Sequence, residues 1–310
     1  MWRRYSEPAI GLSEDLDVPV AIGIALLHLG AVAAFFKFSW FAFGLFVALH
    51  WLTSSVGVSL AFHRMLSHRS FRPVRWLKLL LVGIGCLALQ GRPFYWVSVH
   101  RLHHVDPDGP NDPHTPRHGL GWSHYGWMLR QNTGGDRREK VIRDLLADPA
   151  MVWLNRFCPV IQLTSVVAIF VFGVLAARMG VATSGLSCVL WGVGMRTVVA
   201  YHSTWLVNSA AHRWGYSNFE TRDDARNLWW VGLLTYGEGW HNNHHAHPGS
   251  ARIGKRWFEL DLSWMALRIL QLTRLVSHVK TTVMNTPARL GAARDVRSPS
   301  AAAVNAWEAE

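Results

Sequence analysis

Residues 38–68 read FSWFAFGLFVALHWLTSSVGVSLAFHRMLSH, a long apolar run that ends in two histidines. A helix needs about 20 apolar residues to cross a bilayer, and residues 38–62 supply them. Three further runs are long enough, at residues 18–36, 157–177 and 181–207. The first two runs are separated only around Lys37, and the last two only around Arg178. We therefore predict an all-α membrane protein with four transmembrane helices in two tight hairpins.

A shorter apolar run, residues 76–90, is led by three basic residues and ends at Gly91. Basic side chains beside an apolar face are typical of helices that lie in the membrane interface. We predict an interfacial helix here, between the two hairpins.

The distribution of charge predicts the orientation in the membrane. Half of the 310 residues are hydrophobic and only 16% are charged. Of 31 Lys and Arg, Lys37 and Arg178 lie in short outer loops and Arg196 lies inside the fourth span, which leaves 31 − 3 = 28 on the opposite side. The positive-inside rule then places both termini in the cytoplasm. Anionic lipid head groups and an acidic partner protein explain the net charge of +11 better than nucleic acid does.

Histidines gather in the motifs HRMLSH (63–68), HRLHH (100–104) and HNNHH (241–245), and NSAAH (208–212) adds another. All four motifs fall on the predicted cytoplasmic face. Imidazole is the usual neutral ligand of iron, copper and zinc, and so many imidazoles imply more than one ion. The candidate metal ligands are His63, His68, His100, His103, His104, Asn208, His212, His241, His244 and His245.

Spacing indicates how these ligands converge. His100, His103 and His104 are three and four residues apart, so they form one patch on a helix, and HNNHH repeats that geometry. His63 and His68 are five apart, which a regular helix places about 140° apart. We therefore expect these two to serve different metals, or to straddle a helix end.

These motifs resemble those of the integral-membrane fatty acid desaturases of the Δ9 type. The resemblance extends to LALQG (87–91), WVSVHRLHH (96–104), WSHYGW (122–127), TWLVNSAAHRWG (204–215) and YGEGWHNNHHAHPGSAR (236–252). The resemblance covers roughly residues 40 to 270 and is closer to the acyl-lipid branch than to the acyl-CoA enzymes. VDPDGPN (105–111) departs from the usual loop, so the acyl carrier stays open.

The resemblance implies a desaturase domain over residues 1–285, in which a four-helix stem carries a cytosolic helical cap with a non-haem di-iron centre. One iron would take His63, His104, His212 and His241, with Asn208 holding a water, and the other would take the remaining five histidines. The implied reaction uses O2 to introduce a cis double bond, at Δ9, into a saturated acyl chain. Dehydrogenation supplies two of the four electrons that O2 needs, so an external donor must supply the others.

The resemblance also implies a bent acyl tunnel that passes the irons and ends within the stem. Val47 and Trp51 lie on one helix face below His63, where Trp51 either closes the tunnel or packs against a neighbouring helix. If Trp51 closes the tunnel, Trp51→Ala would lengthen the accepted chain. Arg196, inside the fourth span, is expected to face the bundle or the tunnel. Glu238, just before HNNHH, is a candidate for orienting a ligating imidazole.

Other interpretations remain at this point. HPGS (247–250) is similar to a haem-binding motif, but the rest of the chain leaves no room for a haem domain, so we predict no haem and a separate, ferredoxin-like donor with its reductase. A di-iron membrane hydroxylase or oxygenase of alkyl or isoprenoid chains would use similar clusters. A metal transporter or sensor would instead line a path through the bilayer. Residues 286–310 predict a disordered tail.

Overall fold

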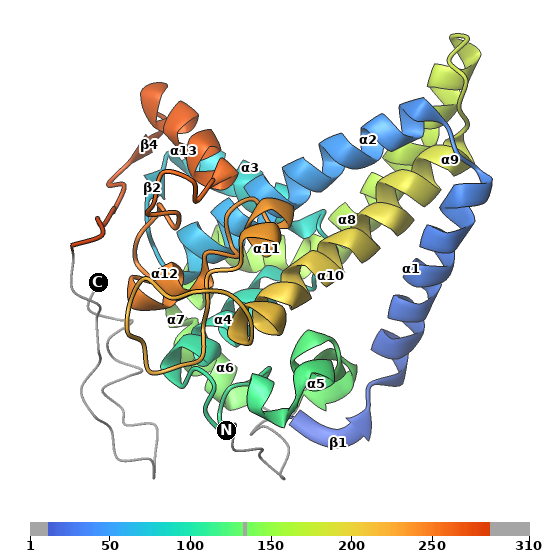
Figure 1. The fold of residues 1–310 in the computed structure, drawn as a ribbon. Coiled ribbons are helices and arrows are strands. Elements are labelled where there is room, and N and C mark those ends of the chain that lie inside the picture. The colour runs from blue at the N-terminus through green and yellow to red at the C-terminus, as the bar shows by residue number, and fades with distance from the viewer. Residues whose placement is uncertain (1–11, 133–134, 286–310) are drawn as a thin grey trace.

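The computed structural model describes residues 12–132 and 135–285, and most of them are helical (Figure 1). Within these ranges three helices are long and apolar enough to cross a membrane. They are α1 (Val18–Phe36), α2 (Trp40–His50) with its direct continuation η1 (Trp51–Ser67), and α8 (Pro149–Arg178). They correspond to three of the four predicted spans. The predicted tail, 286–310, lies outside the described residues.

The fourth predicted span, 181–207, coincides with a continuous helix of lower hydropathy. It consists of α9 (Gly185–Val189), η4 (Leu190–Met195) and α10 (Arg196–Asn208). Arg196 and His202 lower its mean hydropathy, so it is not among the helices that are apolar enough to cross a membrane by this measure. It nevertheless packs directly against α1 and α2, and Figure 1 shows it beside them in the stem.

The sequence encodes the starts of these helices through capping side chains. Asp17 Oδ1 accepts a hydrogen bond from Val20 N at 3.2 Å at the start of α1, and Ser39 Oγ accepts one from Ala42 N at 3.1 Å at the start of α2. Asp148 caps α8 in the same way. Because the first amide groups of a helix have no partner within it, these side chains fix where each helix begins.

The outer faces of α1 and α8 are apolar and exposed. Leu26 and Leu29 on α1 are 62% and 65% exposed, and Leu163 on α8 is 67% exposed. Exposed apolar surface of this extent marks contact with another apolar medium. Together with the helix lengths, this makes the chain a membrane protein.

The predicted interfacial helix is present as α3 (Arg75–Cys86), although it ends earlier than the predicted residue 90. α3 packs on η1 and α8. A Cβ atom on Gly57 of η1 would lie 2.9 Å from Gly85 Cα, so these glycines let the two helices cross backbone against backbone. On its other face Trp76 and Leu80 are exposed, which gives α3 the two-faced character that an interfacial helix needs.

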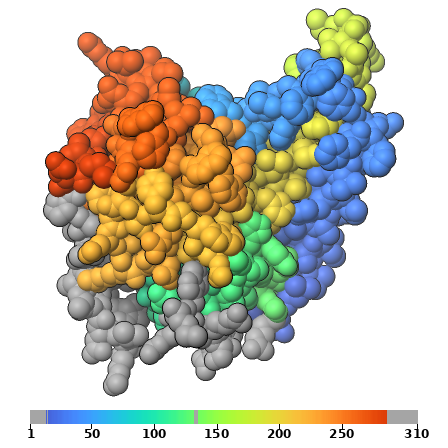
Figure 2. Space-filling model, in the orientation of Figure 1, coloured from blue at the N-terminus to red at the C-terminus, as the bar shows by residue number. Residues whose placement is uncertain are grey.

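The remaining elements form a cap at one end of the stem, and in Figure 2 its C-terminal part makes a continuous surface. Its ligand-bearing helices are α4 (Pro93–Val105), η5 (Ala210–His212) and α12 (His241–Ala246). The others are η2 (Pro116–His118), α5 (Leu120–His124), η3 (Gly126–Leu129), α6 (Gly135–Val141), α7 (Arg143–Leu146), α11 (Trp229–Leu234) and α13 (Leu262–Leu272).

Two short antiparallel strand pairs modify the all-α prediction. β1 (Leu12–Leu16) pairs with β3 (Arg130–Asn132), and β2 (Arg72–Pro73) pairs with β4 (Val276–Ser277). Each pair joins segments far apart in the chain. The main apolar core contains Phe62 and Leu66 of η1 together with Leu81 of α3, Met151 of α8 and Leu267 of α13.

Candidate metal centre

η1 is wound as a π-helix, and this changes where His63 and His68 lie. In a π-helix each amide bonds to the carbonyl five residues earlier, and His68 N donates to His63 O at 3.1 Å. Residues five apart therefore share a face, and the two rings lie 4.8 Å apart between centroids. The expectation that they serve different metals is wrong, because it assumed a regular α-helix. The alternative, that they straddle a helix end, is confirmed, since η1 ends at Ser67 and His68 is its C-cap.

Five histidines form the first cluster, with their ligand atoms within 4.8 Å of one another. Nε2 of His63 lies 3.1 Å from Nε2 of His244, which lies 2.9 Å from Nε2 of His104. His68 Nε2 lies 2.7 Å from His100 Nε2. The cluster therefore collects rings from the end of η1, from α4 and from α12.

The other four histidines form the second cluster, on the same criterion. His241 Nε2 lies 3.0 Å from Nε2 of both His212 and His245, and His245 Nε2 lies 3.2 Å from His103 Nε2. All nine predicted histidines thus point their Nε2 atoms into two adjacent groups. Asn208, the last residue of α10, lines the cavities beside them.

The partition differs from the one that the resemblance implied. His63 and His104 belong with His68, His100 and His244, whereas His103 and His245 belong with His212 and His241. Helix geometry explains the difference. His100 and His104, like His241 and His245, are four residues apart and share a helix face, so each such pair stays together. The neighbouring His103 and His244 point to the other cluster.

Four carboxylates hold the outer ring nitrogens of the ligand histidines. Glu238 lies 2.6 Å from His63 Nδ1, the orienting contact that we expected for it. The other three pairs are Asp112 with His103 at 2.8 Å, Asp108 with His212 at 2.9 Å, and Asp223 with His245 at 2.8 Å. Carboxylates in this position fix the tautomer of a histidine and direct its other nitrogen at a metal.

Asp108, Asp112 and Asp223 were not predicted from the sequence as partners of the ligand histidines. A signal was present, because residues 106–113 read DPDGPNDP, in which aspartates alternate with turn-forming residues. Asp108 adopts φ +58°, a left-handed conformation that brings its carboxylate into the buried site. Asp223, in the loop before α11, had no comparable signal.

Protonation makes these clusters a fit for metal ions. His103 and His245 each donate an Nδ1 proton to a carboxylate, so as neutral rings both leave a lone pair on Nε2. Those two lone pairs face each other at 3.2 Å. Two nitrogens bound at about 2.1 Å to one ion also lie roughly 3 Å apart. A cation bound by both nitrogens would remove the repulsion between their two lone pairs.

The electrostatics of most ligand rings agree with this fit. His212 differs, because, although burial opposes it, Asp108 raises its pKa to about 9, so this ring must lose a proton to bind a metal. Burial, reinforced by the neighbouring histidines, holds the pKa of His100, His104 and His241 well below 6.5, which keeps these rings neutral. Burial alone would raise the pKa of Glu238, but His63 and Arg64 bring it down to about 2. The three buried aspartates likewise keep a lowered pKa because of their histidine partners. Four carboxylates give a charge of 4 × (−1) = −4, which two divalent ions would balance.

Two buried arginines anchor the segments that carry the ligands. Arg64, 1% exposed, forms two hydrogen bonds with Asp261 and one salt bridge with Glu238. Arg101, fully buried, binds both oxygens of Asp144 and also donates to Leu66 O. These bonds join η1 to the segments around Glu238 and Asp261, and α4 to α7 and η1, so the positions of the flanking histidines depend on them.

The two asparagines within HNNHH have structural partners. Asn242 Oδ1 accepts from the amides of Asn218 and Phe219, at 2.8 and 2.9 Å. Asn243 donates to Glu259 Oε2 at 2.8 Å and accepts from Asn227 Nδ2 at 2.9 Å. They fasten the short helix α12 to the loops around it, which explains why polar residues separate its histidines.

The comparisons with known proteins agree with this site. Residues 38–271 match the fatty acid desaturase family. An sn-1 stearoyl-lipid 9-desaturase of Anabaena variabilis is 43% identical over 82% of this chain and 90% of its own length. An sn-2 palmitoyl-lipid 9-desaturase of Nostoc sp. (strain 36) is 40% identical, over 88% and 93%.

The chain belongs to the fatty acid desaturase family. A palmitoyl-monogalactosyldiacylglycerol delta-7 desaturase of Arabidopsis thaliana is also 40% identical, over 84% of this chain and 68% of the relative. The protein is therefore an enzyme, an oxidoreductase that desaturates acyl chains. A transporter or sensor of metals is no longer an alternative.

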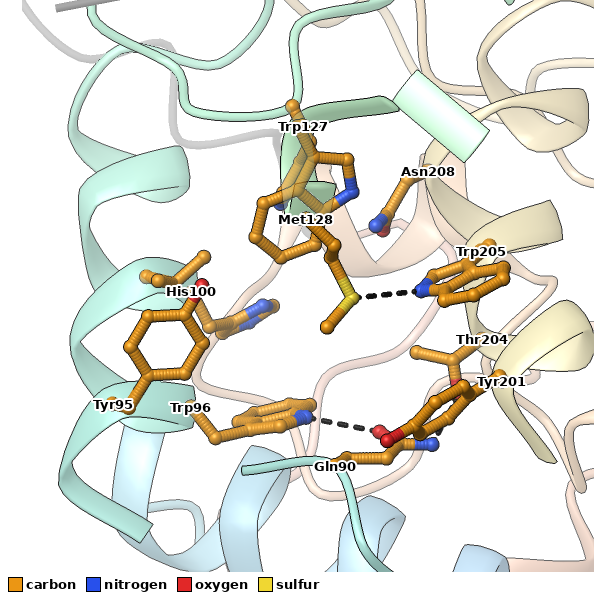
Figure 3. Close-up of a pocket in the computed structure, with 12 residues that line it drawn as sticks. Gln90, Tyr95, Trp96, His100, Trp127, Met128, Tyr201, Thr204, Trp205 and Asn208 are labelled. Atoms are coloured by element: carbon orange, nitrogen blue, oxygen red, sulfur yellow. Dashed lines mark hydrogen bonds between the residues drawn. The ribbon is translucent and has the colours of Figure 1, made fainter. Parts of the chain in front are cut away.

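The desaturase has two adjoining cavities that reach the histidines, and both are lined by Trp96, His100, Thr204 and Asn208. Figure 3 shows the first, walled largely by aromatic side chains. Trp96 Nε1 donates to Gln90 Oε1 at 3.1 Å, and Gln90 Nε2 donates to Thr204 Oγ1 at 2.9 Å. Trp96 also stacks on His100, with ring centroids 5.3 Å apart. The polar network thus fixes an aromatic wall directly beside a candidate metal ligand.

The residues expected at the tunnel lie elsewhere. Val47 and Trp51 are 48% and 42% exposed on the outer surface, and neither lines either cavity. The cavity-facing positions of this helix are Ser54, Val58 and Ser59, all within the π-helical segment that begins at Trp51. The two cavities therefore do not support Val47 and Trp51 as tunnel residues, and that role stays a prediction.

Arg196 is buried, as expected, but serves the fold of the desaturase. Its guanidinium donates to Leu87 O at 2.7 Å, to Thr53 Oγ1 at 3.1 Å and to Gly192 O at 2.8 Å. Leu87 caps the C-terminus of α3, where a cation meets the negative end of the helix dipole. Arg196 lines neither cavity. Of the two predicted positions, the bundle interior and the tunnel, the structure therefore supports the bundle interior.

Proposed function

We propose that this desaturase binds two irons and uses O2 to introduce a cis double bond, at Δ9, into a saturated acyl chain of a membrane lipid. One observation carries the proposal: nine imidazoles converge in two adjacent clusters at the end of an apolar cavity. The lipid 9-desaturases of Anabaena and Nostoc, as similar relatives, support the lipid carrier and the Δ9 position. An acyl-CoA substrate is the alternative carrier.

Iron suits the donor set better than the other imidazole-binding metals do. Zinc is almost always four-coordinate in protein sites, whereas the first cluster offers five imidazoles. The second cluster offers four, and Asn208 is placed at the cavity wall, where it would hold a water. The bound irons would supply the oxidising power, drawn from O2, that removal of hydrogen from an unactivated methylene requires.

The desaturase itself contributes position and the exclusion of water. The acyl chain would lie in the cavities against Trp96, Thr204 and Val58, with its reacting carbons beside His100 and Asn208. The delta-7 relative is as similar as the Nostoc 9-desaturase, so overall identity does not determine the bond position. The depth of the cavity relative to the clusters would determine it.

We further propose four membrane spans, with α9, η4 and α10 as the fourth, and a cytosolic cap with both termini on that side. The charge distribution of the sequence supports this orientation. Every ligand lies near or beyond the end of a helix at the cap, which agrees with reduction by a soluble partner.

The electron donor would be a separate ferredoxin-like protein with its reductase, and no haem is required. Exposed arginines at positions 213, 226, 252 and 256 lie in the segment that also carries His241, His244 and His245. A basic surface this close to the clusters is complementary to an acidic carrier.

Expression in a host that lacks the activity tests the proposal directly. Mass spectrometry of the host lipids with localisation of the double bond should show a new Δ9 cis bond in lipid-bound acyl chains. Metal analysis should give two irons per chain, and active protein with one iron or fewer would refute the di-iron site. Oxygen-18 from O2 retained in the product would instead favour the hydroxylase alternative.

A further inference from the structure

An arginine lies against one wall of the first cavity. Tyr95, in the first turn of α4, lines this cavity, and Figure 3 shows it on the side opposite Thr204 and Trp205. The guanidinium of Arg138, on α6, lies over the Tyr95 ring, with its Cζ 5.4 Å from the ring centroid. A guanidinium at this distance from an aromatic face makes a cation–π contact. A positive charge is therefore fixed at the edge of the aromatic wall.

Arg138 is held by packing and not by hydrogen bonds. Its Nε atom is buried without a hydrogen-bond partner. Among the residues that the structure describes, no carboxylate forms an ion pair with Arg138. Buried donors in folded proteins almost always have a partner, and one that lacks it is a sign of an unseen ligand, ion or water. The guanidinium nitrogens of Arg138 are thus available to an acceptor from outside the chain.

Two further arginines lie near the same end of α4. Arg92 is the N-cap residue of this helix. Asn155 Oδ1, on α8, accepts a hydrogen bond from Phe94 N at 3.0 Å, which brings the neighbouring Arg156 to the start of α4. Arg92 and Arg156 are exposed, and neither forms an ion pair with a described carboxylate. These two residues and Arg138 are called the arginine group below.

The protein does not neutralise the charge of the arginine group. The buried or half-buried carboxylates of this region already have cationic partners, since Asp148 binds Lys78 at 2.7 Å and Asp144 binds Arg101 at 2.6 Å. The acidic residues of α6 itself, Asp136 and Glu139, are exposed to solvent. Unpaired positive charge beside an apolar cavity attracts an anion that carries an apolar chain.

The surroundings of Arg156 indicate that the arginine group lies at the level of the lipid head groups. Its Cζ lies 5.8 Å from the ring centroid of Phe157, and the rings of Phe157 and Trp153 lie 4.9 Å apart. Both rings are exposed, at the end of the span α8. Exposed aromatic and basic side chains at the end of a span are typical of the membrane interface. The phosphate groups of a phospholipid lie in this layer.

We propose that the arginine group, with Arg138 as its central contact, is a phosphate subsite that holds the carrier of the acyl chain while the chain lies in the first cavity. The inference rests on the proposed function and deepens it. The planar guanidinium binds two phosphate oxygens at once, so it selects phosphate over an uncharged sugar. A phospholipid and acyl-CoA both carry phosphate, and the interfacial position of Arg156 favours the phospholipid.

The test compares two lipids with the same acyl chains. Nanodiscs contain equal amounts of dipalmitoylphosphatidylglycerol and dipalmitoyl monogalactosyldiacylglycerol, and mass spectrometry measures desaturation of each. We expect the wild type to prefer the phospholipid, and Arg138→Gln to reduce that preference about tenfold through the loss of a charge-assisted hydrogen bond. Arg137→Gln is the matched control, because it removes the same charge from α6 but Arg137 donates to Asn111 Oδ1 at 3.1 Å. Equal preferences in the two variants would overturn the proposal.

Palmitoyl-CoA as the only substrate distinguishes the two sources of phosphate. An effect of Arg138→Gln on palmitoyl-CoA alone would assign the phosphate to coenzyme A and overturn the phospholipid as the ligand.

A third measurement does not depend on turnover. Calorimetric titration of the full chain, loaded with Zn2+, with dioctanoylphosphatidylglycerol should show about tenfold weaker binding to Arg138→Gln than to Arg137→Gln. Equal affinities would contradict the subsite. A wild type that binds this lipid but consumes no O2 with iron bound would support the subsite and count against the proposed function instead.

Discussion

Asp144→Asn is the sharpest test of how the ligand-bearing helices are held. Asp144 binds Arg101 through both oxygens, at 2.6 and 2.9 Å, and Arg101 has no exposed surface. Removing one partner of a buried pair costs about 3–5 kcal/mol, because the remaining charge is left uncompensated. The Asp144 side chain is 33% exposed, so solvent screens part of this effect. We expect a loss of about 2–3 kcal/mol.

Thermal unfolding of the full chain in lipid nanodiscs measures this loss, which should lower the midpoint by roughly 4–12 °C. Asp148→Asn is the matched control. It removes a partly exposed ion pair with Lys78 at 2.7 Å but keeps an asparagine to cap α8. The control should lose less than about 1 kcal/mol. Equal midpoints for the two variants would refute the assignment of Arg101 and Asp144 as an anchoring pair.

The dependence on pH provides an independent check. Although burial opposes it, hydrogen bonding and charge from Arg101, with help from Arg69, keep the pKa of Asp144 below its usual value. A carboxyl group whose pKa is lowered on folding stabilises the protein above its unfolded pKa. That stability disappears as the pH falls toward the folded pKa. The difference in midpoint between wild type and Asp144→Asn should therefore shrink on acidification below about pH 4.

Three further outcomes are expected. Asp223→Asn should weaken iron binding about 10- to 100-fold, measured by metal retention against a chelator, because His245 loses the carboxylate that orients it. Trp51→Ala should leave the acyl-chain profile of the host lipids unchanged, whereas Val58→Phe should shift it toward shorter chains, since only Val58 faces a cavity. Turnover at low donor concentration should fall as salt rises, because exposed charges act over only about 8–10 Å at physiological ionic strength, and salt-independent turnover would refute the basic docking surface.

Features that depend on composition, or on residue spacing along regular helices, were predicted from the sequence. Residues 18–36 coincide with α1, and Glu238 lies against a ligand as expected. The π-winding of η1 could not be predicted, because no residue between 51 and 67 is a sequence signal for it. The expected angle between His63 and His68 was therefore wrong. Trp51, the first residue of this segment, is exposed and lines neither cavity. The remaining carboxylates escaped prediction because each reaches its histidine through an irregular loop, where contact is set by tertiary structure.

The apolar outer faces of α1 and α8 have a consequence for the cell. Only 11% of the residues in the most apolar window of either helix are buried within the protein, so lipid acts as the solvent for much of their surface. An enzyme that desaturates acyl chains changes the fluidity and packing of that solvent. The free energy that holds α1 and α8 in place is therefore linked to the accumulated product of the enzyme, and growth conditions that alter membrane composition will change the stability of the desaturase itself.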